Sequence, residues 1–171
     1  MPGKPRIGVS RCLLGDEVRH DGRHKRNTTL LEILGPQVEW VPVCPELEVG
    51  MGVPREAVHL VAHADGIRLL GVDSRMDWTD TMTAWARGRI EDLERLDLSG
   101  FVLKADSPSC GTKDVRVLSD AGERGDGRGV FADALLRMLP DLPVIDEREL
   151  EDPERREQFI RRALGYHARR T

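Results

Sequence analysis

The run Arg6-Ile7-Gly8-Val9-Ser10 predicts a short buried strand near the start of the chain, and Cys12 follows it closely. Two later apolar runs have the same character and precede the other two cysteines: residues 38–43 before Cys44, and residues 100–104 before Cys110 with a short polar loop between. In an open α/β sheet, ligands bind in the crevice beyond the carboxyl ends of the strands. We therefore expect three thiols that are distant in the sequence to converge in space and to bind a metal ion or cluster.

Strands alternate with helices along the rest of the chain. Helical periodicity is clearest over residues 77–96, and further helices are expected over 29–34, 131–139 and from 153 to about 168. Residues 58–62 and 67–72 flank Ala64-Asp65-Gly66, which predicts a β-hairpin, and the glycine-rich segment 121–129 predicts a mobile surface loop. The expected fold is α/β and single-domain: a mainly parallel, Rossmann-like sheet with helices on both faces and the hairpin at one edge.

Composition excludes several classes of protein. The 171 residues include 26 basic and 30 acidic side chains, and the net charge of −4 argues against broad binding to nucleic acid, so that tRNA is a disfavoured partner. No apolar stretch approaches the ~20 residues that span a membrane, and the N-terminus lacks the features of a secretory signal. Three cysteines are an odd number that suits no disulfide framework. We expect a cytoplasmic protein whose thiols are free for metal binding or catalysis.

Polar residues beside the cysteines are candidates for chemistry. Glu46 is either a solvated carboxylate or an acid/base close to the thiols. Ser107 and Ser109 are either turn residues around a proline or hydroxyls that hold a substrate and pass a proton. Lys104 ends a predicted strand, where a lysine is uncommon unless it is paired or aimed into a site, and the nearest candidate partner is Asp106.

A basic loop over residues 20–26 precedes a predicted helix. Such a loop is usually a solvated surface, but Arg23, His24 and Lys25 could instead contact a phosphate. His24 is also a candidate for a fourth metal ligand, although a surface position is the simpler interpretation.

Several separate motifs, in order, make the chain resemble the thiouracil desulfurase (TudS-like) family over about residues 5–146. They are Ser10-x-Cys12-Leu-Leu-Gly15, Arg19-x-Asp21-Gly22, Lys25-Arg26, Val43-Cys44-Pro45-Glu46, Gly50-Met51-Gly52-Val53-Pro54-Arg55, Leu103-Lys104-x-x-Ser107-Pro108-Ser109-Cys110-Gly111 and Gly129-Val-Phe131-Ala. On this resemblance, residues 1–150 form the desulfurase domain and residues 151–171 a C-terminal helical extension.

The resemblance implies an activity and a cofactor. Cys12, Cys44 and Cys110 would bind three irons of a 4Fe–4S cluster, and the fourth iron would have no protein ligand. Family members remove sulfur from thiolated uracils, and some relatives act on thiolated uridine or its nucleotides. For this chain we expect a hydrolysis that needs no electron transfer and releases sulfide. Glu46 and Ser107 match the family's catalytic acid/base and serine.

Two alternative functions use the same three cysteines. A non-catalytic zinc-binding module would add a histidine to complete a tetrahedral site. A redox sensor would instead form a reversible disulfide. The sequence leaves the oligomeric state open.

Overall fold

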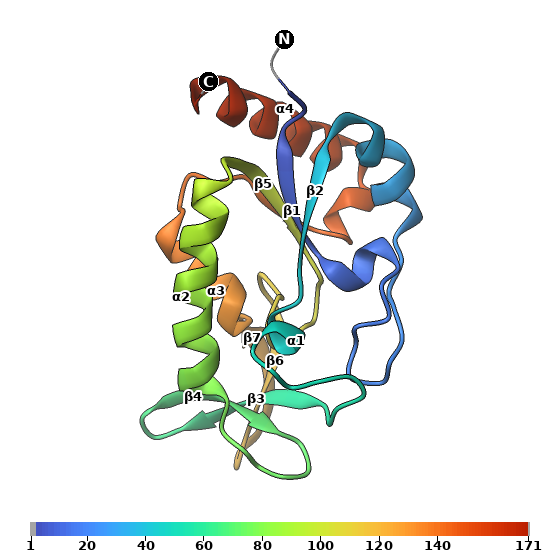
Figure 1. Ribbon diagram of the computed structural model, residues 1–171. Helices are drawn as coiled ribbons and strands as arrows, with labels where there is room; N and C mark the ends of the chain where they lie inside the picture. The colour runs from blue at the N-terminus through green and yellow to red at the C-terminus, as the bar shows by residue number, and fades with distance from the viewer. Residues whose placement is uncertain (1–2, 171) are drawn as a thin grey trace.

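Four parallel strands form the central sheet of the computed structural model, which describes residues 3–170 (Figure 1). Their order across the sheet is β2 (Glu39–Val43), β1 (Arg6–Ser10), β5 (Leu98–Leu103) and β8 (Val144–Asp146). Because every pairing in this sheet is parallel, the carboxyl ends of all four strands lie at one edge. The predicted α/β class, with its mainly parallel sheet, is confirmed.

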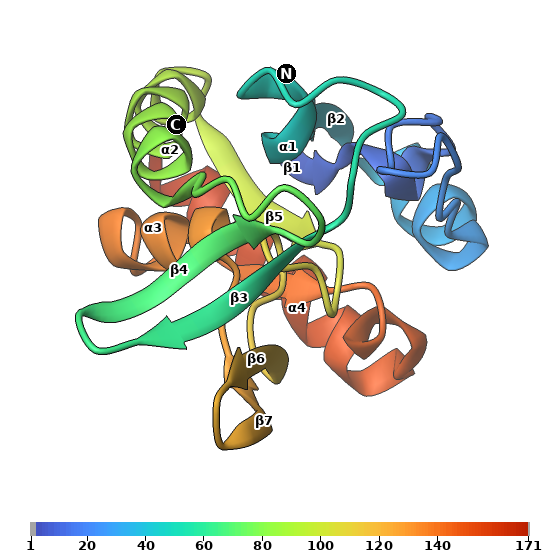
Figure 2. The ribbon, with the colours of Figure 1, turned by 90° about the horizontal axis from the view of Figure 1, so that it is seen from below.

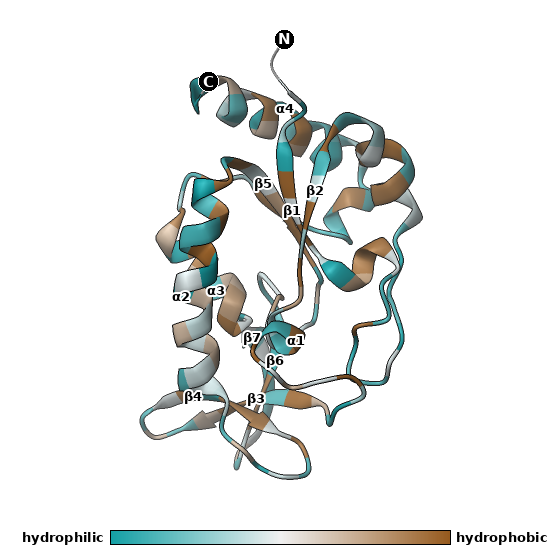
Figure 3. Ribbon diagram, in the orientation of Figure 1, coloured by the Kyte–Doolittle hydropathy of each residue, from teal (hydrophilic) through white to brown (hydrophobic). Residues whose placement is uncertain are grey.

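Helices cover both faces of this sheet, as predicted. On one face lie α2 (Thr79–Arg95) and α3 (Val130–Met138). On the other lie α4 (Pro153–Arg170), the short helical turns η1 (Arg11–Leu14), η2 (Leu30–Leu34) and η4 (Glu149–Glu151), while η3 (Gly35–Gln37) and α1 (Pro45–Glu48) flank β2. Figure 3 shows apolar residues along β1 and β5, which are the strands buried between these layers.

Side chains of β5 alternate between the two layers. Phe101 packs against the helices α2 and α3, whereas Val102 packs on the opposite face with α4. The Phe101 ring also covers Gly8 of the neighbouring strand, where an added Cβ would lie 2.3 Å from a ring carbon. Gly8 is therefore required by close packing of β1 against β5.

A second sheet lies below the first in Figure 1, and the view from below in Figure 2 brings it to the front. Its order is β4 (Gly66–Gly71), β3 (Val58–His63), β6 (Val115–Ser119) and β7 (Gly122–Gly127). The predicted hairpin forms as β3 and β4, but its predicted place at the edge of the parallel sheet is wrong. Its apolar side chains, Leu60 and Leu69, pack with Met82 of α2 and with β6. Because β3 also pairs with β6, the hairpin belongs to a separate sheet.

The prediction of a mobile loop over residues 121–129 is also wrong, because β7 pairs there with β6. β7 is an edge strand whose residues are exposed except for Gly127, so it lacks the alternation of apolar residues that marks most strands.

The helical extension predicted beyond residue 150 corresponds to α4, which begins at Pro153, and its Phe159 and Ala163 belong to the core with Ile7 and Val9. The predicted domain (residues 1–150) and extension (residues 151–171) also include residues 1–2 and 171, which lie outside the described residues. Between residues 3 and 170, none of the helices has the length and apolarity that crossing a bilayer requires.

Candidate active site

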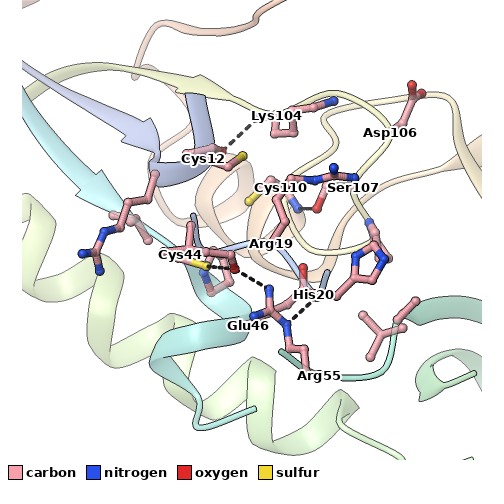
Figure 4. A pocket seen from close by; sticks show the side chains of 18 of the residues that line it. Cys12, Arg19, His20, Cys44, Glu46, Arg55, Lys104, Asp106, Ser107 and Cys110 are labelled. Atoms are coloured by element: carbon pink, nitrogen blue, oxygen red, sulfur yellow. Dashed lines mark hydrogen bonds and ion pairs between the residues drawn. The ribbon is translucent and has the colours of Figure 1, made fainter. Parts of the chain in front are cut away.

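A pocket of about 260 Å³ opens at the carboxyl ends of β1, β2 and β5 (Figure 4). All three cysteines line it, so their predicted convergence is confirmed. The other polar lining residues are Ser10, Arg11, Arg19, His20, Glu46, Arg55, Lys104, Asp106 and Ser107. Because parallel strands end at one edge of the sheet, the topology itself gathers these side chains.

Each cysteine is held by its own local structure. Cys12 lies in η1, and its carbonyl accepts the N–H groups of Gly15 and Lys25, which folds the loop back over the strand end. Cys44 directly precedes α1, and its N–H donates to Glu48 Oε2 at 2.9 Å. Cys110 is the most buried of the three, at 5% exposure.

Burial raises the pKa of all three thiols. The pKa of Cys12 rises to about 11, although the nearby Lys104 ammonium partly opposes the effect. The pKa values of Cys44 and Cys110 are raised by burial as well. Without a metal, these thiols are neutral at pH 7, and a bound metal centre would displace their protons. A redox sensor needs an exposed thiol of low pKa, so this environment argues against that alternative.

The donor set fits a cluster better than a single ion. Within residues 3–170, no three His, Cys, Asp or Glu side chains lie close enough together to hold one metal ion. The zinc site that was the other alternative is therefore not supported in the described part of the chain, and His24, its candidate histidine, is exposed and does not line the pocket. Three soft thiols spread over the walls of one pocket suit a larger iron–sulfur centre. Arg55 and Lys104 line the same pocket, and each is paired with a carboxylate, Glu46 and Glu147 respectively.

Glu46 is the second residue of α1 and faces the pocket beside Cys44 (Figure 4). Its side chain is only 17% exposed, so it is not the fully solvated carboxylate of the simpler interpretation. Its oxygen Oε1 lies 3.5 Å from Arg55 Nε. This position suits an acid/base for a ligand held by the cysteines.

Ser107 and Ser109 have different environments. Ser107 lines the pocket, and its Oγ accepts the N–H groups of Ser109 at 3.2 Å and Cys110 at 3.0 Å, which leaves its O–H free to donate into the pocket. Ser109 is fully buried outside the lining, and its Oγ has no hydrogen-bond partner among residues 3–170. A substrate contact for Ser109, predicted from the sequence, is not supported by this placement.

Lys104 lines the pocket as expected, but its predicted partner, Asp106, is wrong. The Lys104 ammonium lies 2.9 Å from Glu147 Oε1, and Glu147 Oε2 accepts the N–H of Ala105 at 2.6 Å. Asp106 pairs with Arg148 instead, at 3.1 Å. Sequence reasoning missed Glu147, although it directly follows β8 and so occupies the same strand-end position as the cysteines.

The basic loop contributes different residues from those predicted. Arg23, His24 and Lys25 are exposed and lie outside the pocket lining, whereas His20 and its neighbour Arg19, which precedes the loop, line the pocket. Both Arg19 and Arg55 belong to the motifs quoted above, and this membership is the signal by which they could have been found. No role was predicted for either residue.

Known proteins resemble this chain in family, sequence and fold. The model of the 2-thiouracil desulfurase family matches residues 7–147. The chain is 30% identical over 151 residues to the uncharacterized protein YbbK of Bacillus subtilis (strain 168), a match that covers 85% of this chain and 98% of YbbK. A solved structure, the [4Fe-4S]-dependent thiouracil desulfidase TudS, is similar with a TM-score of 0.69 and 27% identity, over 87% of this chain and 95% of that one.

Proposed function

Because this chain belongs to the 2-thiouracil desulfurase family, an enzyme family that cleaves C–S bonds, we propose that it removes sulfur from thiolated uracils in the thiol-lined pocket. The observation that carries the proposal is the placement of three thiols, Glu46 and the Ser107 hydroxyl around one pocket at the end of the parallel sheet. Thiols alone would suit a structural metal centre, whereas an acid/base and a free hydroxyl beside them suit a reaction.

We propose that Cys12, Cys44 and Cys110 bind three irons of a 4Fe–4S cluster, with no protein ligand on the fourth iron. When bound, such a cluster supplies a Lewis-acidic iron that attracts the soft sulfur of the substrate and stabilises it as it leaves. The family membership and the [4Fe-4S]-dependent neighbour support this cofactor.

The chain's own residues would then perform a hydrolysis. Glu46 takes a proton from a water molecule, whose oxygen attacks the ring carbon of the thiocarbonyl group. The carbon–sulfur bond breaks, a carbon–oxygen double bond replaces it, and sulfur leaves as sulfide. Ser107, whose oxygen already accepts two N–H groups, donates its O–H toward the substrate or passes a proton. No electrons are gained or lost in the sum of thiouracil and water to uracil and hydrogen sulfide.

The substrate class extends, in this proposal, from thiolated uracil to its nucleoside and nucleotides. The uracil base lies inside the pocket, between walls that include Arg19 and His20. The exposed Arg23, His24 and Lys25 lie outside the lining, where they would serve only a phosphate that projects from the mouth of the pocket. The net charge of −4 disfavours tRNA, and free thiols suit the reducing cytoplasm.

The test is anaerobic reconstitution followed by incubation with 2-thiouracil or 4-thiouracil and measurement of the loss of thione absorbance. We expect about four irons per chain and turnover in the wild type. Glu46→Gln should retain the iron and lose about 100-fold or more in kcat. Zinc in place of iron, or full activity of Glu46→Gln, would contradict the proposal.

A further inference from the structure

Arg55 is a buried cation in the wall of the pocket, with only 5% of its side chain exposed. Burying an arginine side chain costs free energy of folding unless its N–H donors are hydrogen-bonded. We propose that Arg55 is a positioning residue: it fixes the carboxylate of Glu46 and the wall formed by residues 18–20 relative to each other. This inference rests on the proposed function, in which Glu46 is the acid/base.

The guanidinium is anchored by neutral acceptors rather than by Glu46. Its Nη1 donates to the carbonyl of Gly52 at 2.7 Å, and its Nη2 donates to the carbonyl of Val18 at 2.9 Å. These two bonds are shorter than the 3.5 Å contact from Nε to Glu46 Oε1. The backbone therefore sets the position of Arg55, and Arg55 in turn orients Glu46 through one oxygen, so that Oε2 is left for a water molecule in the pocket.

Arg55 also joins the pocket wall that carries Cys44 to the wall formed by residues 18–20 (Figure 4). The carbonyl of Val18 accepts both Arg55 Nη2 and, at 3.9 Å, the thiol of Cys44. The backbone N–H of Arg55 donates to the carbonyl of His20 at 2.9 Å. One residue thus connects α1, the segment 18–20 and the turn at Gly52, which are distant in the sequence but adjacent at the pocket.

A purely structural arginine would make similar bonds to carbonyl groups. The two roles differ in how the loss of Arg55 combines with the loss of Glu46. If Arg55 acts through Glu46, removing Arg55 does not lower kcat further once the Glu46 carboxylate is gone. If Arg55 is only structural, the fold-loss in kcat from removing Arg55 multiplies the fold-loss from removing Glu46.

The experiment is a double-mutant cycle of Arg55→Met, Glu46→Gln and the double variant, each reconstituted and assayed with 2-thiouracil. We expect Arg55→Met to keep about four irons per chain and to lose about 100-fold in kcat, because a small displacement of a catalytic group has this effect. KM should change less than kcat, and the double variant should match Glu46→Gln. Arg55→Lys keeps the charge but not the three contacts, so its kcat should lie between those of wild type and Arg55→Met. If Arg55→Met does not fold, Arg55→Lys takes its place in the cycle.

The matched control is Arg68→Met, which removes an arginine paired with Asp77 at 2.8 Å on the second sheet, and it should keep wild-type kcat. A second readout does not use activity: trypsin should cut the loop 15–27 faster in cluster-free Arg55→Met than in cluster-free wild type or Arg68→Met, because the Val18 anchor is lost.

Multiplicative losses in the cycle, unchanged kcat in Arg55→Met, or unchanged cleavage of the loop would each overturn the positioning role. If wild type turns over and Glu46→Gln does not, such a result refutes the inference alone. A reconstituted wild type without turnover overturns the proposed function and this inference together.

Discussion

Lys104, which lines the pocket, forms an ion pair with Glu147, with Nζ and Oε1 2.9 Å apart. They follow the neighbouring parallel strands β5 and β8, and their side chains are 20% and 11% exposed. Glu147 also accepts the N–H of Ala105, so this carboxylate holds both the side chain and the backbone of the segment that leads to Cys110.

Glu147→Gln should therefore lower the stability of the cluster-free protein. Glutamine keeps an acceptor for the Ala105 N–H but leaves the Lys104 ammonium without its carboxylate, and we expect a loss of about 1–3 kcal/mol in the free energy of unfolding by urea. Arg95→Met, which removes an exposed pair with Asp92, is the control and should change stability by less than about 0.5 kcal/mol. Equal stabilities of the two variants would show that the Lys104–Glu147 pair contributes nothing.

Two glycines offer a test of the packing. Gly8→Ala places a Cβ 2.3 Å from the Phe101 ring, so it should destabilise the fold by about 1–3 kcal/mol. Gly88→Ala lies in α2 with no atom within 4 Å of the added Cβ, so it should stabilise the protein by about 0.5–1 kcal/mol. Thermal unfolding of both variants measures the difference, and similar shifts of the melting temperature would contradict the close approach of β1 and β5.

The convergence of the cysteines was predictable because it depends on strand order and direction alone: Cys12 lies two residues after the run that forms β1, and Cys44 directly follows the run that forms β2. Glu46 and Ser107 were found by their proximity to those cysteines in the sequence. The partner of Lys104 was not predictable, because Glu147 is distant in the sequence and only the pairing of β5 with β8 brings it near. Likewise β7 gave no strand signal, because its polar, glycine-rich residues are stabilised by pairing with β6 rather than by burial.

The raised thiol pKa values predict slow alkylation of the cluster-free protein. A pKa of about 11 for Cys12, compared with 9.0 for a free thiol, lowers its thiolate fraction at pH 8 by about 100-fold. Reaction with iodoacetamide, followed by mass spectrometry of the modified peptides, should therefore accelerate about tenfold per pH unit up to about pH 10. Cys110 should react last, because it is the most buried. Alkylation of Cys12 at pH 8 as fast as that of glutathione would refute the buried, neutral environment.

The two serines before Cys110 should respond differently to substitution. Ser107→Ala removes the pocket hydroxyl and leaves the N–H groups of Ser109 and Cys110 without their acceptor, so we expect kcat with 2-thiouracil to fall by about 10- to 100-fold. Ser109→Ala removes a buried hydroxyl that has no partner among residues 3–170, so it should raise stability by about 1 kcal/mol. A larger loss of kcat in Ser109→Ala than in Ser107→Ala would reverse the assignment.

The decisive measurement is the product balance of the reconstituted protein with 2-thiouracil in ¹⁸O-labelled water, without any electron donor. Hydrolysis in the pocket of Cys12, Cys44, Cys110, Glu46 and Ser107 predicts uracil and sulfide in equal amounts, with the label in the new carbonyl group of the uracil. Absence of uracil from a protein that carries its full complement of iron, or uracil formed only after addition of a reductant, would contradict it.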